Sequence, residues 1–286
     1  MSQRQWKSDD TSKWLGGWGT GVDGDLTISA DTTEAPIDSS CSGTATQSTL
    51  SATNVNFASN QFLLIHQTRG TGAGIWELNK ILSYTAGTIT LSYPLINTYT
   101  DSGASQAQVR VMKQYNNVTI NNTKTYTAKA WNGDTGGILG FFAKGLVTVT
   151  GTITSVGKGF RGGAAVQTNN ATGYTGESST AASSQSASAN GMGGGGGAGD
   201  DNGASHEGSG GGGGGYATGG TAGENGNGAT GGGAAGGTGG AASLTTLFFG
   251  GGGGSGGNDN VASGPSGVGG ASGGAIIILG KNITIT

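Results

Sequence analysis

Glycine tracts in the C-terminal half constrain the fold of this chain more than any other feature. Gly accounts for 64 of the 286 residues, and 40 of these glycines lie within residues 191–274, including six in succession at 210–215. Gly loses more backbone freedom on ordering than any other residue, so fixing 40 of them costs roughly 20–40 kcal/mol more than fixing 40 alanines. Because Gly has no side chain to bury, only dense backbone hydrogen bonding can offset that cost.

Two structures are compatible with such tracts. One is a disordered linker, the usual outcome for Gly-rich segments. The other is a set of extended left-handed chains with three residues per turn, packed so closely that Cβ atoms have no room, as at the axis of collagen. We favour the ordered form, because polar inserts separate the tracts as turns would separate rods. The chain also closes with the strand-like sequence GGAIIILGKNITIT at 273–286, which needs a partner in the preceding β region.

Charge and cysteine usage exclude several classes of function. The net charge is −3, and no Lys or Arg occurs between Arg161 and Lys281, which argues against nucleic-acid binding. We interpret the acids of that span as solubilising; they are Glu177, Asp200, Asp201, Glu207, Glu224 and Asp259. Cys41 is the only cysteine, so we expect neither an intrachain disulfide nor a thiolate metal site.

The sequence also predicts no membrane insertion and no cofactor. No window approaches 18 apolar residues, and the N-terminus lacks the hydrophobic core of a signal peptide. If Met1 is the natural start, the protein is made in the cytosol and is not secreted by a cleaved signal. GTGAG at 70–74 is no phosphate-binding loop, because it lacks the trailing Lys-Ser/Thr and a following helix.

Short strands with polar turns occupy residues 21–156. An apolar–Thr–apolar triplet recurs, at 26–28, 89–91, 118–120, 147–149 and 283–285. Thr119 and Thr148 lie 29 residues apart, about one coil of a solenoid or one long hairpin repeat. Other intervals are irregular, so a β-helix is favoured over a sandwich and both remain open. In residues 145–155, Val147, Val149 and Ile153 face a core while the intervening threonines face outward.

The expected fold is therefore all-β: a β-helix-like or sandwich domain with an inserted polyglycine-II-type Gly-rich domain and a returning C-terminal strand. The expected divisions are an N-terminal attachment segment (1–20), the β domain (21–156), the Gly-rich domain with variable loops (157–274) and the returning strand (275–286). Three tryptophans of the first segment are candidates for assembly with a partner: Trp6, Trp14 and Trp18. The apolar run Ile276–Leu279 is expected to be buried on both faces.

One resemblance adds to these expectations. The run AWNGDTGGILGFFAKGLVTVTGTITSVGKGFRGG at 130–163, the Gly tracts and the closing strand together resemble Gly-rich β-proteins of bacteriophage tail fibres and adhesins. The Gly region is similar to tip adhesins of T-even-like phages, in which polyglycine-II helices carry variable loops that contact the host receptor. The chain differs from those adhesins in the large β domain that precedes its glycines.

The resemblance implies a virion protein made in the host cytoplasm, with a location on the bacterial surface as the alternative. It implies partners of two kinds: other fibre proteins bound through the N-terminal region, and a host surface protein or glycan. Association of several copies is compatible with it. Large residues in the inserts between the Gly tracts are then receptor-binding candidates: Tyr174, His206, Tyr216, Leu247, Phe248 and Phe249. For Phe248 and Phe249 the alternative is packing against the rods.

Catalysis finds little support in the sequence. β-Helical polysaccharide-degrading enzymes place two or three carboxylates in one groove. Here Asp101 and Asp134 stand singly, and Glu77 lies near Arg69 and Lys80 in the sequence, which we interpret as surface ion pairing. We expect a non-enzymatic binding protein, with a structural fibre subunit as the main alternative and a polysaccharide-active enzyme as the least favoured one.

Overall fold

The computed structural model describes residues 18–54, 56–199, 207–226, 231–240, 245–259 and 264–286, and its secondary structure is all-β, as predicted. The strands are β1 (Leu26–Ile28), β2 (Thr32–Thr33), β3 (Asp38–Ser42), β4 (Thr49–Ala52), β5 (Phe62–Arg69), β6 (Trp76–Thr85), β7 (Thr88–Leu91), β8 (Gln106–Tyr115), β9 (Val118–Ile120), β10 (Thr125–Thr127), β11 (Ile138–Val149), β12 (Thr152–Thr154) and β13 (Ala275–Ile285). Within the described part of the chain, no helix is long and apolar enough to cross a bilayer.

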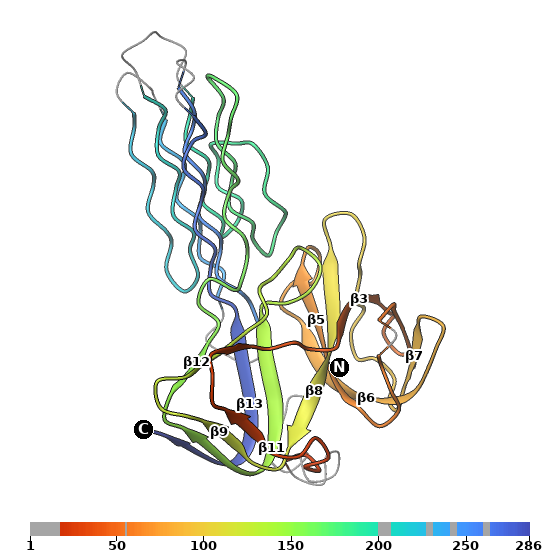
Figure 1. The fold of residues 1–286 in the computed structure, drawn as a ribbon. Coiled ribbons are helices and arrows are strands. Elements are labelled where there is room, and N and C mark those ends of the chain that lie inside the picture. The colour runs from red at the N-terminus through yellow and green to blue at the C-terminus, as the bar shows by residue number, and fades with distance from the viewer. Residues whose placement is uncertain (1–17, 55, 200–206, 227–230, 241–244, 260–263) are drawn as a thin grey trace.

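The fold has three parts: a β-helix, a barrel and a set of extended glycine chains (Figure 1). The first part is a short β-helix, in which parallel strands stack on one another. β1, β9, the second half of β11 and the end of β13 form one face, and β2, β10 and β12 form the other. Four of the five triplets align in register, so that Thr27, Thr119, Thr148 and Thr284 form one column. The flanking apolar residues of β9 and β11 point into the coil and are buried. The fifth triplet, at 89–91, lies elsewhere, in β7.

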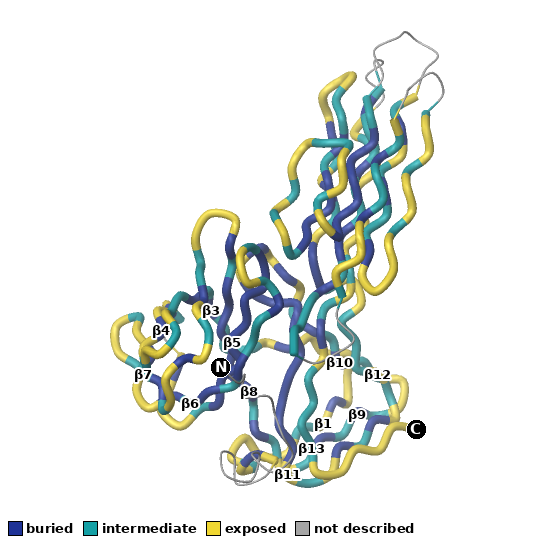
Figure 2. Tube along the Cα trace, turned by 180° about the vertical axis from the view of Figure 1, so that it is seen from behind, coloured by how far each residue is buried: buried dark blue, intermediate teal, exposed yellow. Residues whose placement is uncertain are grey.

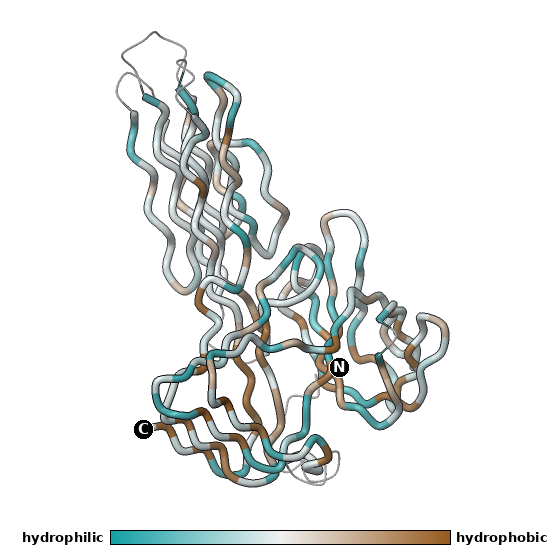
Figure 3. The backbone as a smooth tube through the Cα atoms, in the orientation of Figure 1, coloured by the Kyte–Doolittle hydropathy of each residue, from teal (hydrophilic) through white to brown (hydrophobic). Residues whose placement is uncertain are grey.

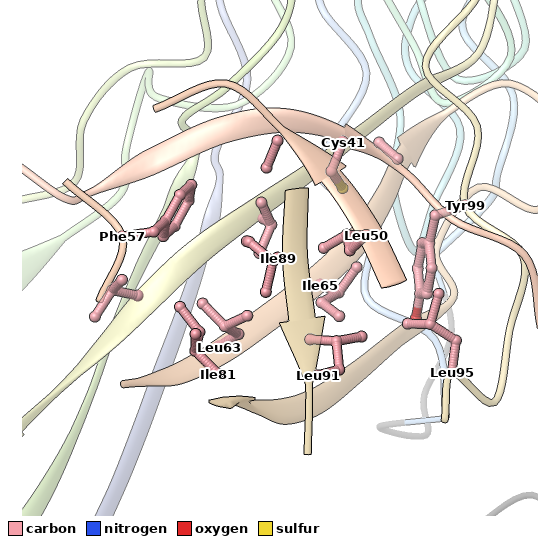
Figure 4. Packing of buried hydrophobic residues seen from close by; sticks show 14 residues of the cluster. Cys41, Leu50, Phe57, Leu63, Ile65, Ile81, Ile89, Leu91, Leu95 and Tyr99 are labelled. Carbon is pink, nitrogen blue, oxygen red and sulfur yellow. The ribbon is translucent and has the colours of Figure 1, made fainter. Parts of the chain in front are cut away.

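A closed antiparallel barrel is the second part, and the sequence analysis did not foresee it. β8 pairs with β3 and β5, and the circuit continues through β4, β7 and β6 back to β5. Alternate residues point inward, and the interior is filled by side chains that include Leu50, Ile65 and Tyr99 (Figure 4). Cys41 is buried there, so its thiol pKa lies well above the ordinary value because burial disfavours the thiolate. The barrel is inserted between the first and second coils of the β-helix.

Extended glycine chains form the third part, between β12 and β13. We call the following segments the glycine rods: 159–168, 171–177, 193–199, 207–215, 219–226, 231–240, 250–259 and 264–274. They project from the end of the sheet where β11 begins and β13 follows the last rod (Figures 1 and 2). The residues of the rods are mostly near neutral in hydropathy, whereas apolar residues concentrate in the β parts and where the rods join them (Figure 3).

β13 returns to the β-helix, as the fold prediction required, but its environment differs from the prediction. It pairs in parallel with β11 over nearly its whole length, from Ile138↔Ala275 to Val149↔Ile285. Among the described residues no strand pairs with its other edge. The expectation that Ile276–Leu279 is buried on both faces is therefore wrong: Ile276 is 41% exposed and the next three residues are half-buried.

Candidate functional site

A repeat of three residues governs the hydrogen bonds between the rods. In the rod 207–215, N–H groups of Ser209, Gly212 and Gly215 donate to the carbonyls of Ala198, Gly195 and Met192 at 2.8–2.9 Å. The carbonyls of the same three residues accept from Gly257, Gly254 and Gly251 at 2.8–2.9 Å. The backbone N–H groups of Gly210, Gly213 and Tyr216, the residue after this rod, donate to the carbonyls of Glu224, Thr221 and Thr218 at 2.7–2.9 Å. This rod thus binds several neighbours through its backbone alone.

Close approach of backbones explains why these positions are glycine. A Cβ atom at Gly254 would overlap the carbonyl oxygen of Gly195, and one at Gly212 would overlap that of Ala234. The neighbouring atoms are backbone, so they cannot move aside as a flexible side chain could. In the outer rod 264–274 the restriction depends on the position: a Cβ at Gly267 or Gly270 meets nothing within 4 Å, whereas one at Gly269 would overlap the carbonyl oxygen of Gly253.

We call the end of the rods remote from the β-helix the distal end. Asn170 occupies the turn between the first two rods with φ 59°, a left-handed conformation that Asn tolerates, and its N–H donates to the carbonyl of Asp259 at 3.0 Å. Gly199 lies against Asn170, and Gly226 lies against Glu207. The described surface of this end is polar and exposed, including Asn169, Glu207 and Glu224.

The proximal end of the rods is fixed by a buried carboxylate that the sequence analysis had counted only as a solubilising acid. Glu177 is fully buried and forms ion pairs with Arg69 of β5 and with Arg161 (3.0 Å from Nε to Oε2). The indole Nε1–H of Trp131 donates to Oε2 at 3.0 Å. Four segments therefore meet at one side chain, and the two arginines compensate the buried charge. Arg161 in GFRGG, the last basic residue before the Gly-rich span and 16 residues before Glu177, was the signal that could have indicated this joint.

Phe249 completes the joint and corrects a prediction. Its ring is 1% exposed and packs edge-on against Phe160 and Trp131, with centroids 5.2 and 6.1 Å away. The expectation of an exposed receptor-binding ring is therefore wrong for Phe249, because an aromatic ring flanked by glycine rods gains more from the apolar pocket beneath them. The alternative, packing against the rods, is what the structure shows for this residue.

Leu247 and Phe248 also lie at the proximal end. The backbone N–H of Leu247 donates to Gly74, and its carbonyl accepts from Nε2 of buried His66 at 2.7 Å. Burial lowers the pKa of His66 to about 4, so the ring is neutral at physiological pH. The Phe248 ring lies directly over Gly74.

A shallow cleft of about 510 Å³ opens beside Phe248. Its walls come from three loops and the ring itself: Gly70, Thr71, Gly72, Ala73, Ala104, Ser105, Ser179, Thr180 and Phe248. These residues bring hydroxyl groups and one aromatic face together, without a titratable side chain. The cleft can therefore contact a neutral ligand but supplies no acid or base.

The remaining candidates are scattered. Tyr174 is half-buried in the middle of its rod, and Tyr216 is 41% exposed at a proximal turn, beside Gly240. Trp18 is 38% exposed. His206, Trp6 and Trp14 lie outside the described residues. The structure thus does not gather the five described receptor-binding candidates into one surface.

Glu77 is structural in this fold, and its interpretation as a surface ion pair is wrong. It is 6% exposed, and its Oε2 accepts from the backbone N–H groups of Ile96 and Asn97 and from the Tyr99 hydroxyl at 3.1–3.2 Å. Burial raises its pKa, and these hydrogen bonds oppose the shift. The carboxylate thereby holds the loop at 96–99 over the barrel. The described residues contain no group of three or more His, Cys, Asp or Glu side chains placed to bind a metal ion.

Comparisons with known proteins give one kind of match. No family model matches the sequence, and no curated protein matches it. Two solved structures match part of this chain. One is the Gp54 tailspike of Acinetobacter baumannii bacteriophage AP22 in complex with A. baumannii capsular saccharide, and the other is the tailspike gp49 of Pseudomonas phage LKA1. Each matches 45% of this chain at 10% identity, with a TM-score of 0.24. The matched part spans 23% and 24% of those chains, about a quarter of a tailspike. Similarity at this level does not assign a family.

Proposed function

We propose that this protein is a bacteriophage tail-fibre or adhesin component that binds a host surface protein or glycan, without catalysis, through the turns at the distal end of the glycine rods. The observation that carries this proposal is the bundle of backbone-bonded rods, which brings the described rod ends together at the end remote from the β domain. A bundle of this kind is suited to recognition, because the rod ends that carry the connecting segments are held in place before the ligand arrives and less entropy is lost on binding.

The rods also separate folding from recognition. Their cohesion comes from backbone groups, so the turn residues can change without loss of core packing. Loops on a rigid scaffold are the usual location of binding residues. We therefore assign receptor contact to the distal turns, including the segment with His206, and treat Tyr174 and Tyr216 as secondary candidates. Leu247 and Phe248 remain candidates only for a contact at the proximal cleft.

The same proposal covers location and partners. The chain is a virion protein, with the bacterial surface as the alternative location, and it attaches to other fibre proteins through the N-terminal region. Trp18 supports the attachment role, because its large apolar side chain is exposed; Trp6 and Trp14 are proposed to act with it.

Cell binding of labelled protein to a panel of bacterial strains tests the proposal. The distal variant combines Asn169→Ala, Glu207→Ala and Glu224→Ala with replacement of residues 200–206 by a Gly-Ser segment of equal length. We expect it to lose binding while its thermal unfolding stays unchanged. Leu82→Ser, on the exposed face of the barrel (62% exposed), is the matched control and should bind like the parent chain.

Three results would contradict the proposal. The parent chain could bind no strain, the distal variant could bind like the parent, or the protein could depolymerise the surface glycan of a strain. In the last case Glu77→Gln separates the remaining alternatives: its hydrogen bonds to the 96–99 loop predict lost stability, whereas a catalytic role predicts lost turnover in a stable protein.

A structural fibre subunit is the second candidate function. It is favoured by β13, whose apolar outer edge is not paired within the described chain. Such a subunit would assemble without needing the distal turns. The two functions are compatible in one fibre protein, and the distal variant separates them because it should assemble normally.

A further inference from the structure

The last strand of the β-helix is left uncovered, unlike the strands beneath it. Ile283 and Ile285 of β13 are 44% and 75% exposed, whereas Val147 and Val149, their partners in β11, are at most 5% exposed. Long apolar edge strands with free backbone groups are templates for pairing with another strand. The edge of β13 has neither a bulge at 282–285 nor a proline to prevent such pairing.

The hydrogen bonds between β13 and β11 show which backbone N–H and C=O groups of β13 point to the open edge. The N–H of Thr286 donates to the carbonyl of Val149, so even-numbered residues at this end of β13 face β11. Because the direction alternates along a strand, Ile283 and Ile285 direct their N–H and C=O groups to the open edge. An incoming parallel strand must therefore place one residue between them, opposite Thr284.

β1, at the opposite end of the stack, carries a matching edge. Leu26 donates its N–H to Asn117, and the carbonyl of Ile28 accepts from Asn121, so both residues face β9. Thr27 lies between them and faces the other way, where no strand of the described residues pairs with it. Its N–H and C=O are the pair of groups that the edge of β13 requires.

We propose that β13 binds β1 of a second copy of this chain, head to tail, with Thr27 of that copy opposite Thr284. In this register the N–H of Thr27 donates to the carbonyl of Ile283, and the N–H of Ile285 donates to the carbonyl of Thr27. The threonine column at Thr27, Thr119, Thr148 and Thr284 then continues unbroken into the second copy. Leu26 and Ile28 cover Ile283 and Ile285, which removes the exposed apolar surface from water.

Charge supports this occupant over a second β13. Lys281 precedes the free edge, and in the proposed register it lies one position from Asp25 of the second copy, a charge of opposite sign. A full-length antiparallel pair of β13 strands about a two-fold axis would instead bring two Lys281 side chains near each other, and like charges across strands are unfavourable. Parallel addition also keeps the strands of both copies pointing the same way.

The interface is heterologous, since different surfaces of the two copies meet. It therefore leaves a free β1 at one end and a free β13 at the other, so further copies can add. The coil that contains β13 contributes no strand to the three-stranded sheet of β2, β10 and β12. A gap of one strand would therefore lie between β12 and β2 of the next copy, and the pairing between copies is made by β13 alone. This assembly edge is independent of the distal turns.

Sedimentation of the full chain over a wide range of concentration tests the proposal. We expect the parent chain to associate as concentration rises. Ile285→Pro removes the N–H that bonds the second copy, and Thr27→Pro removes the N–H at the other edge; neither donor is used within the β-helix. Each variant alone should remain monomeric with strand content unchanged by circular dichroism. An equimolar mixture should form a dimer, because one intact β1 and one intact β13 remain.

Ile285→Lys replaces the proline variant if the latter fails to fold, with Val268→Lys as its matched control, since Val268 is similarly exposed (73%) on an outer rod. Loss of association in Ile285→Lys but not in Val268→Lys supports the proposal. A parent chain that stays monomeric at every concentration overturns it, as does unchanged association of the β13 variants. Failure of the mixed variants to pair overturns the head-to-tail mode.

Discussion

At the scale of single residues, the absence of a side chain is the main structural determinant of the rods. Gly254 and Gly212 lie where neighbouring carbonyl oxygens occupy the space of a Cβ. Gly270 lies on an outer rod with that space open, although its carbonyl still accepts a hydrogen bond from Gly253 at 2.9 Å. Identical residues in the same kind of rod are thus under different constraints.

Substitution by alanine should separate these two kinds of glycine. Gly254→Ala should lower the free energy of unfolding by about 1–3 kcal/mol or more, because the methyl group displaces backbone that is hydrogen-bonded. Gly270→Ala should be neutral or stabilise by up to about 1 kcal/mol, since it reduces the entropy of the unfolded chain. Chemical denaturation of both variants measures the difference, and equal effects would contradict the packed-rod arrangement.

The environments of Phe249 and Glu177, in the joint between the rods and the β domain, could not be predicted from the sequence. Six receptor-binding candidates were chosen because large side chains stood among glycines, and for Phe249 that reasoning gave the wrong environment. Local sequence cannot show that Trp131 and Phe160 lie beneath the same rods, more than 80 residues earlier in the chain. Glu177 was missed for a similar reason, because its two arginine partners come from separate elements.

At the scale of elements, two repeats of different kinds organise the molecule. The apolar–Thr–apolar triplet gives the β-helix coils, and its alternation correctly predicted which of Val147, Thr148 and Val149 face the core. The rods follow a three-residue repeat of hydrogen bonds instead. Irregular spacing of the triplets along the chain now has a cause: the barrel and the rods are inserted between successive coils.

Hydrogen exchange should follow the three-residue repeat within a single rod. Gly212 and Gly213 donate to Gly195 and Thr221, whereas no carbonyl of the described residues accepts from Gly211 or Gly214. We expect the amides of Gly211 and Gly214 to exchange faster by roughly tenfold or more, since only bonded amides need local opening. Residue-resolved NMR measures these rates. Uniformly fast exchange along 207–215 would indicate a disordered segment and reject the rods.

At the scale of the whole molecule, a joint of buried charged and aromatic side chains connects the glycine rods to the β domain. Glu177 ends one rod and Phe249 immediately precedes another, Arg69 comes from the barrel, and Trp131 from the loop before β11. The buried charge, the aromatic cluster and the return of β13 all lie within this region. The orientation of the rods therefore depends on contacts that no single part can make alone.

Removal of the aromatic anchor should weaken this connection. Phe249→Ala should destabilise the protein by roughly 3–5 kcal/mol, because it leaves a cavity among Trp131, Phe160 and His66. Phe248→Ala, at the half-buried neighbouring position, should cost less. Denaturant unfolding followed by tryptophan fluorescence measures both. Lost cell binding in a fully stable Phe248→Ala protein would instead support a receptor contact at the proximal cleft.

The sequence by itself determined the all-β class, the insertion of the glycine segment and the return of the final strand, because each follows from local chemistry: β-branched alternation, glycine without side chains, and an apolar strand that needs a partner. The tertiary structure decided which residues these elements pack against. Closure of the barrel, burial of Phe249 and Glu177, and the open edge of β13 all depend on contacts between residues far apart in the chain, whose free energies appear only when those residues are brought together.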